Sequence, residues 1–198
     1  MTSFQRFQKR LLDLFLSVVG IILFGWLILL AALIARIDTG LNGFFRQSRI
    51  GKDGRPFKVI KIRSMKPVQG VDTSVTTDKD PRISPVGRFW RKSKIDELPQ
   101  LWNVLIGNMS FVGPRPDVPG FADKLEGEDR IVLSIRPGIT GPASLQFKNE
   151  EHLLAQQSDP EHYNREVIWP EKVKINRAYI GNYRLSKDLY YIWKTVFN

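Results

Sequence analysis

Residues 14–35 form an uncharged, strongly apolar segment, and this segment constrains the chain more than any other feature. A continuous helix of these 22 residues would be about 33 Å long, enough to cross the hydrocarbon core of a bilayer. The segment is too long and uniform for the core of a signal peptide, and no small-residue cleavage site follows it. We therefore expect it to enter a membrane rather than to be a buried helix of a soluble core.

Basic residues flank the apolar segment on both sides. They are Arg6, Lys9 and Arg10 before it, and Arg36, Arg46, Arg49 and Lys52 after it. The positive-inside rule favours the cytoplasm for both flanks, and a re-entrant helix that dips into the bilayer and returns would satisfy it. Such a helix needs a break whose backbone groups find new partners, and Gly25 is the best candidate. The residues alone leave open whether the segment crosses or re-enters.

The net charge of +10 is concentrated in one part of the chain. Residues 36–94 carry a net charge of +10, whereas residues 95–198 carry a net charge of −2. Such a basic stretch can bind the phosphates of anionic lipid, nucleotide or nucleic acid, or can simply be a solvated face. The chain contains no cysteine, which excludes disulfides, thiolate metal sites and cysteine nucleophiles. The apolar segment predicts a membrane helix with basic flanks over residues 1–38, and the length of the rest of the chain predicts one globular domain over residues 39–198.

Two β-prone runs, residues 44–50 and 56–65, surround a Gly-Lys-Asp-Gly turn and predict a β-hairpin. Alternation on the second strand places Lys61 and Arg63 on one face. This face could bind phosphate, or it could be an ordinary solvent face, and the two interpretations are about equal.

Helices are predicted after the hairpin. The clearest spans residues 96–107, with Asp96 as N-cap and Pro99 in the first turn; others fall near residues 86–91, 150–157 and 171–183. Residues 66–84 are predicted as a loop. Ser186 is expected to cap a last helix that ends at Phe197 and carries an apolar side of Leu189, Tyr190, Trp193, Val196 and Phe197. That side suits a membrane interface, although packing on a protein core is the preferred interpretation from this helix alone.

The adjacent carboxylates Asp96 and Glu97 are the sharpest chemical feature of the chain. They follow several cations and open a helix, which favours their ionised form. An ionised carboxylate there can cap the helix, bind Mg²⁺ or attack phosphorus, and capping is the default interpretation.

Two proline-flanked arginines are further candidates. Arg115 lies in Gly113-Pro114-Arg115-Pro116, and Arg136 begins Arg-Pro-Gly-Ile-Thr-Gly. A stiff backbone holds a guanidinium with little freedom, which suits the binding of a phosphate. His152 and His162 lack the spacing of a helical metal pair, and we expect both to be surface residues.

Five motifs in series resemble the bacterial sugar transferase family, the small monotopic phosphoglycosyl transferases. They are Lys-Arg-Leu-Leu-Asp from residue 9, Phe-Lys-Val-Ile-Lys-Ile-Arg-Ser-Met from residue 57, Ile-Asp-Glu-Leu-Pro-Gln-Leu-Trp-Asn-Val from residue 95, Met-Ser-Phe-Val-Gly-Pro-Arg-Pro from residue 109 and Arg-Pro-Gly-Ile-Thr-Gly from residue 136. The match runs from about Phe7 to Thr140 and is looser beyond. The chain resembles the minimal catalytic core, without the additional N-terminal membrane domain of larger members.

The resemblance implies the transfer of a sugar-1-phosphate from a UDP-sugar to undecaprenyl phosphate, with release of UMP, as the first membrane step of glycan biosynthesis. Asp96 would be the nucleophile that forms an aspartyl-phosphosugar, and Glu97 would help to hold Mg²⁺ and the nucleophile. Lys61, Arg91 and Arg115 match family positions that act on phosphates, and Arg63 and Arg136 join them as expected phosphate-binding residues. Phosphoryl transfer needs neutralised oxygens and a positioned nucleophile, and these residues could supply both.

The resemblance also implies a fold and a location. We expect a mixed α/β, helix-rich structure with a re-entrant N-terminal helix, a β-hairpin and several amphipathic helices at the membrane surface. The catalytic domain would face the cytoplasm at a bacterial inner membrane, with membrane lipid as partner and without nucleic acid. Gly25-Trp26 stands where many members have Ser-Pro, and Pro142-Ala143-Ser144 replaces the Trp-Ala-Gln of others. The sugar, the glycan pathway and the oligomeric state stay open.

Two rival functions give different expectations. A membrane-anchored module that binds anionic lipid or nucleic acid through residues 36–94 would bind in a strongly salt-dependent way and would be indifferent to Asp96→Asn. A glycosidase would need two carboxylates on opposite sides of a bond, and the adjacent Asp96 and Glu97 are poorly placed for that.

Overall fold

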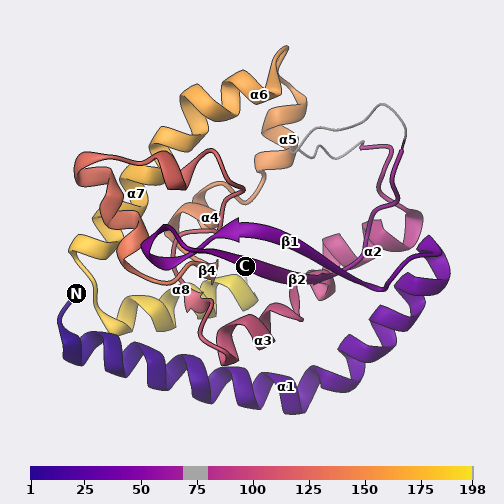
Figure 1. Ribbon diagram of the computed structural model, residues 1–198, viewed down its shortest axis with the longest axis horizontal. Coiled ribbons are helices and arrows are strands. Elements are labelled where there is room, and N and C mark those ends of the chain that lie inside the picture. The colour runs from indigo at the N-terminus through magenta and orange to yellow at the C-terminus, as the bar shows by residue number, and fades with distance from the viewer. Residues whose placement is uncertain (69–79, 198) are drawn as a thin grey trace.

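The computed structural model describes residues 1–68 and 80–197 and is a helix-rich α/β structure, as predicted. Its helices are α1 (Ser3–Thr39), α2 (Pro85–Ser93), α3 (Gln100–Leu105), α4 (Pro142–Gln146), α5 (Glu150–Ala155), α6 (Pro160–Tyr163), α7 (Trp169–Gly181) and α8 (Leu185–Phe197), and its strands are β1 (Phe44–Ile50), β2 (Pro56–Ile62), β3 (Ser110–Val112) and β4 (Gly138–Thr140). In Figure 1, α1 runs along the lower edge, the β1–β2 hairpin lies above it, and α5 and α6 lie at the opposite edge. The globular part therefore rests on α1.

Helix α1 contains the whole apolar segment. Thr2 and Gln5 form a capping box at its start, and Gly40 ends it in the left-handed region at φ 71°. The helical backbone continues through Gly25, so the break predicted there is absent, although the axis changes direction along its length (Figure 1). Among the described residues, α1 is the one helix that is long and apolar enough to cross a membrane.

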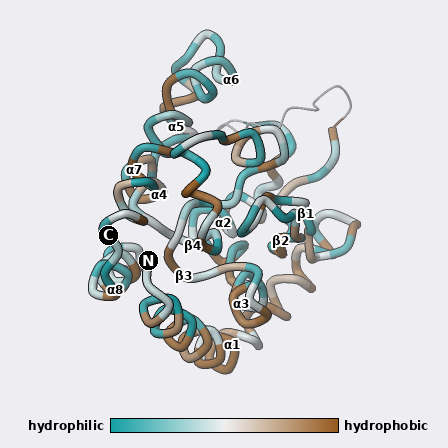
Figure 2. The backbone as a smooth tube through the Cα atoms, turned by 60° about the vertical axis from the view of Figure 1, so that its left-hand side comes forward, coloured by the Kyte–Doolittle hydropathy of each residue, from teal (hydrophilic) through white to brown (hydrophobic). Residues whose placement is uncertain are grey.

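The two faces of α1 differ sharply. Its inward face carries small or polar side chains, and the buried residues are Lys9, Asp13, Ser17, Ala31, Ala32 and Ala35. Its outward face carries large apolar side chains that are more than half exposed, including Phe15, Ile22, Trp26, Leu29 and Leu33. Figure 2 shows the apolar colour concentrated along this helix. Small residues inside allow close packing on the domain, and large residues outside present an apolar surface.

Both halves of α1 pack on the same globular body. In the first half, Arg10 donates hydrogen bonds to the carbonyls of Val104, at 2.7 Å, and Leu105, at 2.8 Å, near the end of α3. In the second half, Ala32 and Ala35 belong to a core cluster with Trp90 of α2. The two ends of α1 therefore lie on one side of the domain.

The predicted β-hairpin is confirmed. Strands β1 and β2 pair antiparallel, from Phe44 opposite Ile62 to Ile50 opposite Pro56. The turn between them needs left-handed backbone, which Asp53 adopts at φ 59° and Gly54 at φ 77°. This register fixes which side chains share a face of the hairpin.

Helix α3 is fastened to the edge of the hairpin by one buried amide. Asn103 accepts a hydrogen bond from the Ile60 amide at 3.0 Å and donates one to the Lys58 carbonyl at 2.8 Å. A buried edge strand must satisfy its backbone groups, and Asn103 does so for β2. The contact places the turn that precedes α3 beside the side chain of Lys61.

Helix α8 corrects the preferred interpretation of its apolar side. Leu189, Tyr190 and Trp193 are each more than half exposed, so this side does not pack on the protein core. The opposite side packs inward, with Asp188 buried and Ile192 against the cluster of Tyr179 and Tyr183. Periodicity identified the apolar stripe but not what covers it. The helix begins at Leu185, so Ser186 lies inside it rather than at its N-cap.

The remaining helix predictions are confirmed in α2, α5 and α7, with boundaries shifted by a few residues. The predicted loop at residues 66–84 is described only at its ends, because residues 69–79 lie outside the described part of the chain. His152 and His162 are exposed, as predicted.

Candidate active site

Asp96 lies in a tight turn before α3 and not at its N-cap. Lys94 adopts left-handed backbone at φ 59°, residues Ile95–Glu97 form a 3₁₀ turn, and α3 begins at Gln100 with Pro99 as its N-cap. No side chain caps α3 by a hydrogen bond there. The predicted N-cap role of Asp96 is therefore wrong, because the 3₁₀ turn displaces it from the start of the helix.

Glu97 is held by two cations. Its Oε1 lies 2.8 Å from Lys61 Nζ and 3.4 Å from Arg115 Nη2. Burial acts to raise the pKa of Glu97, but the charges of Lys61 and Arg115 outweigh it and hold the pKa well below its usual range. Burial also lowers the pKa of Lys61, against the pull of Glu97. Glu97 is thus an ionised carboxylate with a fixed position.

The carboxyl group of Asp96 is more deeply buried and less well satisfied. The residue is 5% exposed, and its Oδ1 is buried without a hydrogen-bond partner in the described part of the chain. Burial, followed by the charge of Glu97, raises the pKa of Asp96 to about 6, although the charges of Lys61 and Arg91 oppose this shift. At neutral pH the carboxyl group is ionised, and its Oδ1 can still accept a hydrogen bond or bind a cation.

Arg115 reaches Glu97 from a bend that two short strands support. Strand β3 pairs parallel with β4, so that Gly113 donates to the Thr140 carbonyl at 2.9 Å and Gly138 donates to the Pro114 carbonyl at 2.8 Å. A Cβ on Gly113 would stand 2.6 Å from the Arg136 carbonyl oxygen, and one on Gly138 would stand 2.2 Å from the Gly113 nitrogen. Glycine is required at both positions because the backbones of the Gly113 and Gly138 segments are in direct contact. The two bends predicted at Arg115 and Arg136 are therefore packed together.

A narrow cavity of about 20 Å³ lies where these parts meet. Its lining comes from the hairpin, from Glu97 and the start of α3, and from the two bends: Arg49, Val59, Lys61, Glu97, Gln100, Arg115, Pro116, Gly138 and Ile139. Asp96, the other carboxylate of the Asp96–Glu97 dyad, lies next to Glu97 in the chain. Arg49 was not among the residues predicted from the sequence. The hairpin register was the available signal, because Arg49 lies on β1 opposite Phe57, on the face that also carries Val59 and Lys61.

The seven predicted site residues do not all meet. Asp96, Glu97, Lys61 and Arg115 come together, and the charge of Arg91 acts on Asp96.

The other two predicted residues bind backbone instead. Arg63 donates to the Asn42 carbonyl at 2.7 Å and lies over the ring of Phe45, and Arg136 donates to the Gly107 carbonyl at 2.7 Å. These bonds engage the Nε groups of Arg63 and Arg136, and the predicted phosphate-binding role of both residues stays untested.

The donor set fits a magnesium ion. Among residues 1–68 and 80–197, no group of three or more His, Cys, Asp or Glu side chains gathers as metal ligands. Mg²⁺ does not need such a cage, because it commonly binds one or two carboxylates together with waters and substrate phosphates. The partnerless Oδ1 of Asp96, next to Glu97, offers the oxygen ligand that such a site requires.

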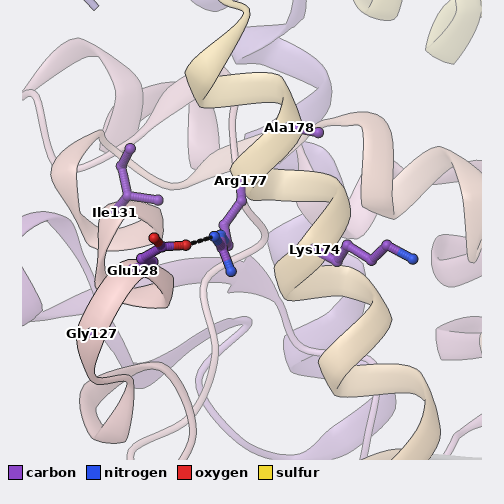
Figure 3. A pocket seen from close by; sticks show the side chains of 6 residues that line it. All are labelled: Gly127, Glu128, Ile131, Lys174, Arg177 and Ala178. Carbon is purple, nitrogen blue, oxygen red and sulfur yellow. Dashed lines mark hydrogen bonds and ion pairs between the residues drawn. The ribbon is translucent and has the colours of Figure 1, made fainter.

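A larger hollow lies away from this chemistry. It has a volume of about 700 Å³, and its lining residues are Gly127, Glu128, Ile131, Lys174, Arg177 and Ala178 (Figure 3). Arg177 points toward Glu128 across it and forms an ion pair, and Arg177 also bonds Asp129 at 2.8 Å. None of the predicted site residues lines this hollow, so its size does not make it the active site.

The chain belongs to the bacterial sugar transferase family, whose model matches residues 4–198. It is 34% identical over 194 residues to the UDP-N-acetylgalactosamine-undecaprenyl-phosphate N-acetylgalactosaminephosphotransferase of Aeromonas hydrophila, with 96% of this chain and 43% of that protein covered. It is 33% identical over 204 residues to the UDP-glucose:undecaprenyl-phosphate glucose-1-phosphate transferase of Escherichia coli (strain K12), covering all of this chain and 41% of that protein.

A third relative matches this chain over nearly the full length of both proteins. The exopolysaccharide production protein PSS of Rhizobium leguminosarum bv. phaseoli is 33% identical over 198 residues, with 95% of this chain and 92% of that protein covered. The chain thus spans about two fifths of the first two relatives and almost all of the third.

Proposed function

We propose that this protein transfers a sugar-1-phosphate from a UDP-sugar to undecaprenyl phosphate and releases UMP. The observation that carries the proposal is the dyad itself: a buried, ionised Asp96 beside a Glu97 that Lys61 and Arg115 hold in place. Family membership and the relatives named as undecaprenyl-phosphate sugar-phosphate transferases support the same reaction.

The reaction would proceed in two displacements at phosphorus. In the first, an Asp96 carboxylate oxygen attacks the β-phosphorus of the donor, the bond from that phosphorus to the bridging oxygen breaks, and UMP leaves with that oxygen. In the second, a phosphate oxygen of undecaprenyl phosphate attacks the same phosphorus and displaces Asp96. The product is a polyprenyl-diphosphate sugar, and the carboxylate is regenerated.

The cations around the dyad would provide the charge that phosphoryl transfer needs. Lys61 and Arg115 already neutralise Glu97, and both line the cavity where donor phosphate oxygens would approach. Asp96 and Glu97 would hold a Mg²⁺ ion, which when bound would screen the repulsion between the carboxylate and the diphosphate. Adjacent carboxylates serve this chemistry better than they serve glycoside hydrolysis, which needs carboxyl groups on both sides of a bond.

The apolar face of α1 supports a membrane-surface site. Trp102 of α3, Ile106 directly after α3, Phe89 of α2 and Trp193 of α8 are further exposed apolar residues, and all three helices contact α1. Both halves of α1 pack on the same body, so a crossing would have to detach one of them. We therefore propose that α1 enters the bilayer and returns by its change of axis direction (Figure 1) instead of by a break at Gly25, with the domain on the cytoplasmic face of a bacterial inner membrane.

The decisive experiment measures UMP release by the full chain in lipid nanodiscs, supplied with Mg²⁺, undecaprenyl phosphate and a panel of UDP-hexoses and UDP-N-acetylhexosamines. We expect release with at least one sugar, and a loss of roughly 10³-fold or more in Asp96→Asn. Glu166→Gln, at an exposed residue, is the matched control and should keep wild-type activity.

A second readout tests the intermediate. Without acceptor, wild-type protein should gain the mass of a phosphosugar, and Asp96→Asn should not. UMP release that survives in Asp96→Asn would show that a residue other than Asp96 is the nucleophile. An absence of release with every donor would overturn the proposed function.

A further inference from the structure

Arg49 lines the cavity from the first strand of the hairpin. Its Nε and Nη2 donate to Gln47 Oε1, at 3.1 and 2.6 Å, and its Nη1 donates to the Pro116 carbonyl at 3.2 Å. The next residue, Ile50, donates its amide to the Asp117 carbonyl at 2.9 Å. The end of β1 is therefore fixed to the bend that carries Arg115, and the guanidinium of Arg49 is held at the cavity wall.

The positive charge of Arg49 lacks a close counter-charge. Among the described residues, no carboxylate oxygen lies within 4.0 Å of its guanidinium, in contrast to Lys61 and Arg115, which pair with Glu97. Burial, together with the like charge of Arg115, lowers the pKa of Arg49, against the opposing charges of Asp117 and Glu97. A partly buried cation without a paired anion costs free energy, and a bound anion would recover it.

The guanidinium also retains donors. An arginine side chain has five N–H groups, and the bonds to Gln47 and Pro116 engage three of them. One N–H on each terminal nitrogen is left for a ligand. Terminal N–H groups of a guanidinium match the oxygens of a phosphate group.

We propose that Arg49 is a substrate-binding residue that holds a phosphate group of the nucleoside diphosphate donor. This inference rests on the proposed function and adds to it a third cation, from β1, beside Lys61 and Arg115. Arg49 also donates a hydrogen bond to the Pro116 carbonyl, so it holds the bend that carries Arg115 against the hairpin. The donor phosphates would therefore lie between the hairpin and that bend.

The same strand supplies a matched control. Arg46 is exposed, and its odd spacing from Arg49 places it on the opposite face of the hairpin. Arg46→Gln removes the same charge from the same strand without touching the cavity. A difference between Arg46→Gln and Arg49→Gln therefore reports the site and not the overall charge of the protein.

The test uses the full chain in nanodiscs and measures the dissociation constant of UDP with Mg²⁺ by calorimetry. We expect Arg49→Gln to weaken UDP binding by roughly 10- to 100-fold, as for the loss of hydrogen bonds to a charged group. Arg49→Lys, which keeps the charge but not the fork of donors, should weaken it less. Arg46→Gln should bind UDP as wild type does. In the transfer reaction, the KM for the donor should rise in Arg49→Gln more than kcat falls.

Wild-type UDP affinity in a folded Arg49→Gln protein would overturn the inference while the transfer reaction of the wild type still stands. Should Arg49→Gln lose its thermal transition, the folded Arg49→Lys protein decides: UDP binding weaker than that of the wild type supports the inference, and wild-type UDP affinity overturns it. A wild-type protein that neither binds UDP nor releases UMP would instead overturn the proposed function.

Discussion

Lys9 of α1 and Asp188 of α8 meet in the protein interior, where Nζ lies 2.6 Å from Oδ2 and the two side chains are 8% and 1% exposed. The hydroxyl groups of Tyr179 and Tyr183 also donate to Asp188. Nearby, Asp13 accepts hydrogen bonds from Ser110 Oγ and the Phe111 amide. One turn of α1 is thus bound to both the last helix and the strand that precedes Arg115.

Removal of Lys9 should therefore loosen this contact. We expect Lys9→Met to lower the free energy of unfolding by about 3–5 kcal/mol, because Asp188 would keep a buried charge without its partner. Urea unfolding in detergent measures this. Lys174→Met is the control, since that side chain is 79% exposed and should change stability by less than about 1 kcal/mol. Equal free energies of unfolding for Lys9→Met and Lys174→Met would contradict a stabilising role for the Lys9–Asp188 ion pair.

Two glycines should respond in opposite ways to alanine. Gly113→Ala places a Cβ 2.6 Å from the Arg136 carbonyl oxygen, and separating two paired backbones should cost about 1–3 kcal/mol or more and displace Arg115. Gly25→Ala meets no atom within 4 Å and lies inside a helix, so it should stabilise by up to about 1 kcal/mol. Melting temperatures and donor KM check both. Loss of activity in Gly25→Ala would instead indicate that α1 needs flexibility at this residue.

The raised pKa of Asp96, about 6, predicts a pH-dependent rate. The nucleophile must be ionised, so kcat/KM for UMP release should be constant above about pH 7 and fall tenfold per pH unit below about 6. Glu97, with its pKa well below the usual range, should add no inflection there. Asp117, whose pKa burial raises to about 7, is the competing group, and Asp117→Asn tests it. An inflection that disappears in Asp117→Asn would reassign the titration.

The same pKa predicts a stability change in Asp96→Asn. The carboxyl group titrates near 3.8 when unfolded and near 6 when folded, so its charge opposes folding as pH rises through that window. At pH 7 we expect Asp96→Asn to unfold with a free energy up to about 3 kcal/mol higher than wild type. At pH 3.5 the difference should vanish. Chemical unfolding at both values checks this, and an equal gain at both would point to packing instead of charge.

Local patterns in the sequence determined several elements of the fold. The uncharged run specified a long helix, and the Asp-Gly turn between alternating strands specified the hairpin with its register. Both depend on interactions between residues close in the chain, which is why they could be predicted. The dyad at Asp96 and Glu97, with Lys61 and Arg115, could be predicted only through the resemblance to a family.

Only the tertiary structure decided which residues meet. The parallel pairing of β3 with β4 joins segments far apart in the chain, and it places Arg115 beside Glu97 while Arg136 turns to the Gly107 carbonyl. Arg49 enters the site because the hairpin face and the Pro116 bend converge, which no local pattern specifies. Similarly, periodicity gave α8 an apolar stripe, but only packing showed that Asp188 lies inside and Trp193 outside. The sequence by itself determined the elements and their faces, and long-range contacts decided what each face touches.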